Sequence, residues 1–283
     1  RRVSCPCPSV LSDMVKGRID TGFMLRGIGI RGCNRPLKYS LFSQNEKRAA
    51  MLTTIGFDAD DTLWQNEAFF RLTQDRFRQR LADHADPVHL AERLEAAERR
   101  NLAYYGFGVK GFTLSMIETA VEVTEGRVPG EVIADLIALG RELLEHPMEL
   151  LPHARATVTA LAPDYRLVLI TKGDLLHQEK KLAQSGLGDL FDGVEIVSDK
   201  TEATYRTAFA RHGTGADQAM MVGNSLKSDV VPALQAGSWG VHVPHEHEWA
   251  FEAAEAPVEH RRFHAIADLG DIPALVGRLS NTP

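Results

Sequence analysis

The chain has 283 residues, of which 44% are apolar and 25% charged, so it can bury a full core in one large or two modest domains. No run of 18 or more apolar residues occurs, which argues against a bilayer-spanning helix. Residues 1–50 hold ten Lys and Arg against three Asp and Glu, a net of +7, whereas the remainder holds 22 against 35, a net of −13. An acidic body argues against sequence-independent nucleic-acid binding, which depends on clustered cations.

Residues 1–50 show neither helical nor strand periodicity, and we interpret them as a disordered tail or leader. Their Arg-rich, acid-poor composition also resembles an organelle transit peptide. All three cysteines, Cys5, Cys7 and Cys33, lie in this segment. Because an odd number at one end builds no disulfide framework, we expect a reducing, cytoplasmic compartment.

A regular pattern begins at Met51, where "LTTIGF" predicts a strand. Four segments follow with apolar residues at three- and four-residue spacing and with Pro or Gly between them, and each predicts a helix. Beyond Pro152, the short β-rich runs "YRLVLIT", "GVEIVS", "QAMMVG" and "WGVHV" alternate with helical segments. That alternation is typical of βαβ units and predicts an α/β fold, a Rossmann-like three-layer core with a parallel sheet.

The order of these elements divides the chain into three predicted parts. Residues 1–50 are the tail or leader, residues 51–66 and 151–283 form the α/β core, and residues 67–150 form a helical cap inserted after the first strand.

Acids, hydroxyls and lysines gather where the predicted strands end. Ligands of an open parallel sheet bind at the carboxyl ends of its strands, so these side chains are candidates for one site. They are Asp58, Asp60, Thr171, Lys172, Lys200, Asn224 and Asp229. Asp58 and Asp60 stand two positions apart on an extended chain and therefore share a face at about 7 Å, close enough to flank one phosphoryl group.

Four short motifs, "DADDT", "LITKG", "SDK" and "GNSLKSD", resemble in this order the motifs of the haloacid dehalogenase-like hydrolase superfamily. The resemblance covers essentially residues 52–245. The helical insertion resembles that family's cap, and "FDADDTLWQNE" is most similar to its bacterial small-molecule phosphatases. The resemblance implies a Mg²⁺-dependent phosphohydrolase that acts on a small phosphorylated metabolite.

The resemblance also implies roles for individual residues. Asp58 would be the nucleophile that forms an aspartyl-phosphate, and Asp60 would be the general acid and then the base. Asp58, the Asp60 carbonyl and Asp229 would bind Mg²⁺, which offsets the repulsion between carboxylates and phosphate. Thr171 and Lys200 would complete the catalytic set by holding phosphate oxygens.

Three further features bear on binding. Lys172 follows Thr171 directly and is a predicted substrate-binding residue. In the predicted cap, "YYGFGVKGF", Tyr104 to Phe112, is either a glycine-rich connection between helices or a loop that selects substrate, with Lys110 as a second predicted substrate ligand. Its G-x-G-x-x-G spacing follows a helix rather than a strand, which argues against a dinucleotide site.

Two positions depart from the family pattern. Asp61 stands where the family usually has glycine, and we interpret it as a turn or capping residue. Asn224 stands where aspartate is commoner, which leaves the metal site one carboxylate poorer. Asn224 would be either a hydrogen-bonding neighbour of the metal ligands or a simple turn residue.

Other functions remain open on this sequence. A 2-haloacid dehalogenase would use the same Asp58 on carbon, but it needs neither a metal nor a general acid, so Asp60 and Asp229 favour phosphate. A phosphoglucomutase-type phosphotransferase would keep the same residues. A non-catalytic binding module on this fold is the third alternative, since fold does not dictate function. The substrate and the oligomeric state are not indicated.

Overall fold

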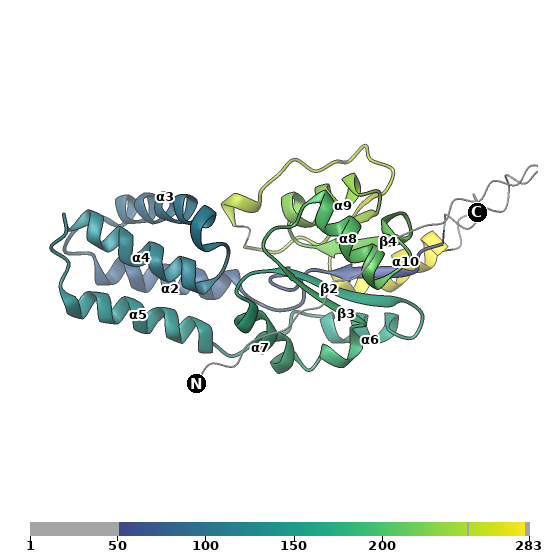
Figure 1. The fold of residues 1–283 in the computed structure, drawn as a ribbon, viewed down its shortest axis with the longest axis horizontal. Coiled ribbons are helices and arrows are strands. Elements are labelled where there is room, and N and C mark those ends of the chain that lie inside the picture. Colours follow the sequence, from purple (N-terminus) through teal and green to yellow (C-terminus); the bar gives the residue numbers. More distant parts are fainter. Residues whose placement is uncertain (1–50, 248, 281–283) are drawn as a thin grey trace, which may run out of the picture. The chain divides into compact units, whose positions relative to one another are not determined.

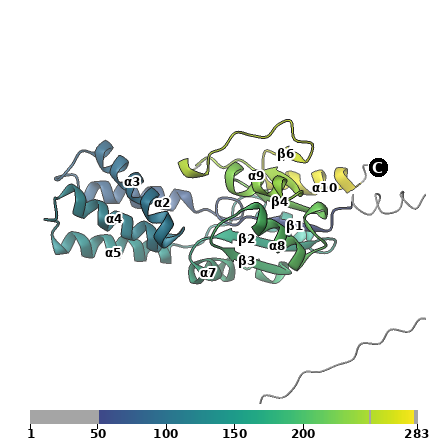
Figure 2. The ribbon, with the colours of Figure 1, turned by 45° about the horizontal axis from the view of Figure 1, so that its top comes forward.

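The computed structural model describes residues 51–247 and 249–280, so the predicted tail with its cysteines lies outside the described residues. Within them, six strands form one parallel sheet in the order β3-β2-β1-β4-β5-β6, of which all but β5 are labelled in Figure 2. The strands are β1 Thr54–Phe57, β2 Arg166–Lys172, β3 Gly193–Val197, β4 Ala219–Gly223, β5 Trp239–His242 and β6 Phe263–Ala265. The predicted parallel α/β fold is confirmed, and β6 is an addition to it.

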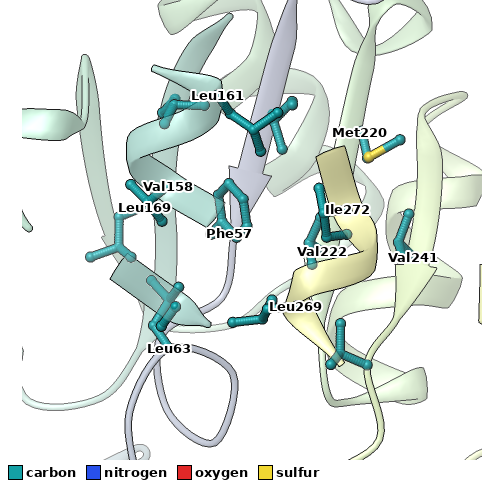
Figure 3. Close-up of a cluster of buried hydrophobic side chains, with 14 of the residues drawn as sticks. Phe57, Leu63, Val158, Leu161, Leu169, Met220, Val222, Val241, Leu269 and Ile272 are labelled. Carbon is teal, nitrogen blue, oxygen red and sulfur yellow. The ribbon is translucent and has the colours of Figure 1, made fainter. Parts of the chain in front are cut away.

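The central strands are apolar on both faces, as buried parallel strands are. Because successive side chains of a strand point to opposite faces, Leu167 and Leu169 of β2 enter one apolar cluster while Val168 and Ile170 enter another. The first cluster, part of which is drawn in Figure 3, gathers Phe57, Val158, Leu161, Met220, Val222 and Ile272 among others. The sheet is therefore the middle layer of three.

Helices supply the two outer layers. On the Leu169 face the cluster includes α6 (Ala154–Leu161) and α10 (Ile272–Ser280). On the Ile170 face it includes α8 (Glu202–His212) and α9 (Val231–Gln235). A capping box between Thr201 and Thr204 fixes the start of α8 by satisfying backbone N–H groups that the first turn leaves free. The predicted three-layer core is thus observed.

Four helices lie between β1 and β2 in the chain and share a separate apolar cluster. They are α2 (Glu67–Arg80), α3 (Pro87–Tyr105), α4 (Val109–Val123) and α5 (Gly130–Glu145), which lie together in Figure 1. Each helix turns an apolar stripe toward this cluster, to which Phe77, Leu90, Met116 and Leu136 contribute, one from each helix. We call these helices the α2–α5 bundle. None of the helices in the described part of the chain is long and apolar enough to cross a bilayer.

Candidate active site

The strand register places the predicted catalytic residues at one edge of the sheet. Phe57, the last residue of β1, pairs with Leu169 of β2 and with Val222 of β4, and β4 continues one residue and β2 three residues beyond this pairing. The Asp58 N–H donates to the Val222 carbonyl over 2.9 Å and extends this pairing by one residue. The side chains that follow these strands therefore converge, as expected for the carboxyl edge of a parallel sheet.

Asp58, Lys200 and Asp229 form a buried triad at this edge. The Lys200 ammonium donates to Asp58 Oδ1 and, over 2.7 Å, to Asp229 Oδ1. The three residues are only 6%, 5% and 1% exposed. Three residues separated by up to 171 positions in the chain are thus brought into direct contact, and their charges are removed from bulk water.

The triad carries more negative than positive charge. Burial and the neighbouring Asp229 raise the pKa of Asp58 to about 7, although Lys200 opposes this shift. For Lys200, burial acts to lower the pKa, but the two carboxylates outweigh burial and raise it, so the ammonium stays charged. When both carboxyl groups are ionised, above the raised pKa of Asp58, one ammonium shared by two carboxylates leaves one negative charge uncompensated.

Asp60 is held as an ionised carboxylate by three donors. Its Oδ1 accepts from Trp64 Nε1 over 2.6 Å and from Lys181 Nζ over 2.5 Å, and its Oδ2 accepts from Gln178 Nε2 over 2.9 Å. Burial acts to raise the pKa of Asp60, but the Lys181 charge and these hydrogen bonds outweigh burial and lower it. Asp60 is therefore a hydrogen-bond acceptor in this conformation.

Thr171 and Lys172 both lie in the site, and each has a partner. Thr171 Oγ1 accepts from Gln178 Nε2 over 3.0 Å. The Lys172 ammonium donates to Ser228 Oγ over 2.8 Å and to Glu252 Oε1 over 2.6 Å. Burial acts to raise the pKa of Glu252, but Lys172 outweighs it and the pKa is lowered. The ammonium of Lys172 is thus already neutralised by an ionised carboxylate.

Asp61 is a turn and capping residue, as the sequence indicates. Its φ is 60°, the left-handed region that favours glycine, so Asp61 adopts a backbone conformation that is uncommon for a residue with a side chain. Its carboxylate accepts from the backbone N–H groups of Asn66 and Glu67 at 2.9 and 3.0 Å and so caps the start of α2. Asp61 therefore connects the catalytic loop to the first helix of the α2–α5 bundle.

Asn224 lies against the predicted metal ligands. Hydrogen bonding favours the amide orientation in which Nδ2 donates to Asp58 Oδ2, the Asp60 carbonyl and Thr62 Oγ1, each at 3.2 Å. Thr62 Oγ1 in turn donates to Asp58 Oδ2 over 3.0 Å. Of the two interpretations of Asn224, the structure favours a hydrogen-bonding neighbour of the site over a simple turn residue.

A cavity of about 170 Å³ opens from the triad toward the α2–α5 bundle. The glycine-rich loop lines it through Gly106, Phe107 and Gly108. Gly108 has a φ of 127°, and a Cβ there would lie 2.7 Å from an Asp174 carboxylate oxygen, so this backbone approach requires glycine. The predicted loop "YYGFGVKGF" is therefore part of the wall of the cavity.

Lys110 lies outside the residues that line the cavity. Its ammonium lies 3.1 Å from Asp174 Oδ1, and its side chain is 62% exposed. Lys110 thus contacts the loop between β2 and α7 (Leu175–Ser185). Its role in substrate binding stays a prediction.

The donor set suits Mg²⁺ better than a transition metal. In residues 51–247 and 249–280, no group of three or more His, Cys, Asp and Glu side chains is arranged to hold a metal ion. The Asp58 and Asp229 carboxylates with the Asp60 carbonyl are nevertheless a suitable set, because Mg²⁺ takes one or two carboxylates and otherwise waters and phosphate oxygens. The uncompensated charge of the triad is the charge that a cation would balance.

Three residues of the site were missed at the level of sequence. Gln178 and Lys181 lie one turn apart on α7, and Glu252 is the last residue of a short 3₁₀ turn, Ala250–Glu252. None belongs to a strand end. The i, i+3 spacing of two polar side chains that are both buried on α7 is the one local signal, and burial cannot be read from a single sequence.

Known proteins resemble this chain over most of its length. A family model described as haloacid dehalogenase-like hydrolase matches residues 52–237. The crystal structure of a haloacid dehalogenase-like family hydrolase from Xanthomonas campestris is 41% identical, covers 81% of this chain and 92% of its own, and superposes with a TM-score of 0.73.

Two curated relatives are named for phosphatase activity. A glyceraldehyde 3-phosphate phosphatase of Methanothermobacter thermautotrophicus is 28% identical over 69% of this chain and 87% of its own length. A ribulose-1,5-bisphosphate 5-phosphatase of Halopiger xanaduensis is 29% identical over 80% of this chain and 100% of its own length.

Proposed function

Because the chain belongs to the haloacid dehalogenase-like hydrolase family, we propose that it is a Mg²⁺-dependent phosphatase acting on a small phosphorylated metabolite. The family and the enzyme class predicted from the sequence, a hydrolase, are confirmed. The observation that carries the proposal is the buried triad of Asp58, Lys200 and Asp229 at the carboxyl edge of the sheet. The printed activities of the two curated relatives support the phosphatase class.

Asp58 is the proposed nucleophile. One of its carboxylate oxygens forms a bond to phosphorus while the bond between phosphorus and the alcohol oxygen breaks, and the alcohol departs with the electron pair. Thr62 and Asn224 hold Oδ2, and Lys200 holds Oδ1, so the carboxylate cannot rotate freely. Water then attacks the aspartyl-phosphate and returns Asp58 with release of phosphate.

Asp60 is the proposed general acid and general base. Its hydrogen bonds determine which of the two protonation states it has in the resting site. In the resting site it is ionised and accepts from Trp64, Gln178 and Lys181, which prepares it to accept a proton from water. To donate a proton to the leaving alcohol it must first take one up. The incoming phosphate dianion favours that uptake, because a nearby negative charge raises the pKa of a carboxyl group.

Mg²⁺, held by Asp58, Asp229 and the Asp60 carbonyl, would supply positive charge that lets phosphate approach the carboxylates. Lys200 and Thr171 would hold phosphate oxygens. Asp229 binds Lys200 in the resting site and so fixes the ammonium beside the nucleophile.

Asn224→Asp is expected to tighten the apparent affinity for Mg²⁺ by about tenfold, because it adds a carboxylate beside the Asp58 and Asp60 oxygens. The measurement is a Mg²⁺ titration of phosphatase activity at pH 8. Gln184→Glu, on the exposed side of α7, adds the same charge away from the site and should leave the titration unchanged. If the apparent Mg²⁺ affinity changed equally in both variants, Asn224 would not be a neighbour of the metal site.

The proposed function is tested by assaying p-nitrophenyl phosphate and a panel of phosphorylated metabolites with Mg²⁺ or with excess EDTA. Hydrolysis that needs Mg²⁺ is expected. Halide release from a 2-haloacid in EDTA would instead favour the dehalogenase. Transfer of phosphate to a sugar hydroxyl in place of water would favour the phosphotransferase, and no turnover of any substrate would contradict catalysis.

A further inference from the structure

We propose that the substrate is the monophosphate of a small, uncharged, hydroxyl-bearing molecule, and that a second anionic group is disfavoured in the part of the cavity formed by the α2–α5 bundle. This inference rests on the proposed phosphatase function. It names the chemistry of the leaving group, which the catalytic triad leaves undetermined.

Part of the cavity wall is apolar. Phe70 of α2 and Phe112 of α4, with ring centroids 5.1 Å apart, line the cavity and provide an apolar wall for a short carbon skeleton. The catalytic residues Asp58 and Lys200 line the same cavity of about 170 Å³, so the phosphoryl group takes up part of this volume.

One buried hydrogen-bond acceptor in the cavity wall lacks a donor. Gln178 is 2% exposed, and its Oε1 has no partner among the described residues. Glu98 and Asn101, three residues apart on α3, also line the cavity with acceptor oxygens, and Asn101 uses its Nδ2 on Ser115 Oγ and Glu118 Oε2. A buried acceptor without a donor is costly, so Gln178 indicates a ligand that supplies an O–H group.

The wall offers no free lysine to a second anion. Eight carboxyl groups and three lysines line the cavity. Each lysine already has a carboxylate partner: Lys172 contacts Glu252, Lys181 contacts Asp60, and Lys200 contacts the triad carboxylates. A carboxylate or second phosphate beside Glu98 would therefore find no uncommitted lysine among the described residues of the wall.

Glu98 suits a hydroxyl in particular. Burial raises its pKa to about 8, with Glu67 and Glu95 adding to the shift. Near neutral pH its carboxyl group therefore holds a proton much of the time and can both donate to and accept from a hydroxyl. His177, which also lines the cavity, adds no positive charge at that pH, because burial and then Lys181 lower its pKa to about 4.

A matched pair of substrates tests the inference. Glycerol 3-phosphate and 3-phosphoglycerate have the same carbon skeleton and differ mainly in one terminal group, a hydroxymethyl group against a carboxylate. With saturating Mg²⁺, we expect kcat/KM to favour glycerol 3-phosphate by at least about tenfold. Comparable values, or a preference for 3-phosphoglycerate, would overturn the inference and leave the phosphatase assignment intact.

Substitutions at Glu98 test whether the α2–α5 bundle causes the preference for glycerol 3-phosphate. Glu98→Lys should move the ratio of the two kcat/KM values toward 3-phosphoglycerate by at least about tenfold. Glu92→Lys makes the same charge change at an exposed position on the same helix, six residues before Glu98, and should leave the ratio unaltered. Equal shifts of the kcat/KM ratio in both variants would show that the preference comes from long-range charge, and would overturn the proposed contact between Glu98 and the substrate.

Two further readouts keep the outcome interpretable. Glu98→Gln retains the shape of the side chain and should lower the preference for glycerol 3-phosphate by a smaller factor, which serves as the test if Glu98→Lys does not fold. An unchanged ratio in a folded Glu98→Gln protein would contradict the role of Glu98. Absence of hydrolysis of every phosphate, including p-nitrophenyl phosphate, would instead reject the proposed function.

Discussion

Asp58→Asn is expected to lower kcat on any phosphomonoester by at least about 10³-fold, because an amide cannot form the bond to phosphorus. The substitution is nearly isosteric, and Lys200 keeps Asp229 as a partner, so the fold should persist. The measurement is turnover of p-nitrophenyl phosphate by protein purified in parallel with the unsubstituted enzyme. Its thermal unfolding should remain cooperative.

A matched control and a chemical readout separate this loss from damage to the fold. Asp189→Asn makes the same change at an exposed position and should retain full activity. Brief incubation with a labelled phosphomonoester should leave acid-stable label on the peptide that contains Asp58, and Asp58→Asn should remove it. If Asp58→Asn keeps more than a few per cent of the activity, another group must be the nucleophile.

The strands of the core could be predicted because a buried strand is a run of consecutive apolar residues. The apolar runs that became β1, β2 and β4 are buried on both faces, so every position carries the signal. The strand β6 was not predicted, since Phe263–Ala265 is three residues long and partly exposed, too short for any period to appear. The order of the strands in the sheet comes from contacts between distant segments, and the sequence indicated only that they are parallel.

In the candidate site too, residues at strand ends could be predicted, whereas residues placed by contacts between distant segments could not. Asp58, Asp60 and Thr171 were predictable because strand ends and motif order place them at one edge of the sheet. Gln178, which bridges Asp60 and Thr171, was not, because its role depends on how α7 packs. The contact between Lys110 and Asp174 was also not predictable, because it joins segments that are far apart in the chain.

The triad also makes Lys200 a determinant of stability. Removing one partner of a buried ion pair leaves an uncompensated buried charge and typically costs about 3–5 kcal/mol. In the folded enzyme the Lys200 ammonium lowers the pKa of Asp58 and opposes burial. Without Lys200, the pKa of Asp58 rises further above its usual range. The folded variant then binds a proton that the unfolded chain releases near pH 4. Its stability therefore falls as the pH rises toward the folded-state pKa, and the deficit is largest above it.

Lys200→Met is therefore expected to lower the free energy of unfolding by about 3–5 kcal/mol at pH 8 and by at least about 1 kcal/mol less at pH 5. Denaturant unfolding in EDTA at the two pH values measures both numbers, and activity with Mg²⁺ should drop below about 1% of the unsubstituted enzyme. Lys180→Met, on the exposed side of α7, should change the free energy of unfolding by no more than about 0.5 kcal/mol at either pH. The two variants would unfold alike if Lys200 were only a surface charge. A loss that did not depend on pH would assign the effect to packing of the lysine side chain rather than to the two carboxylates it holds together.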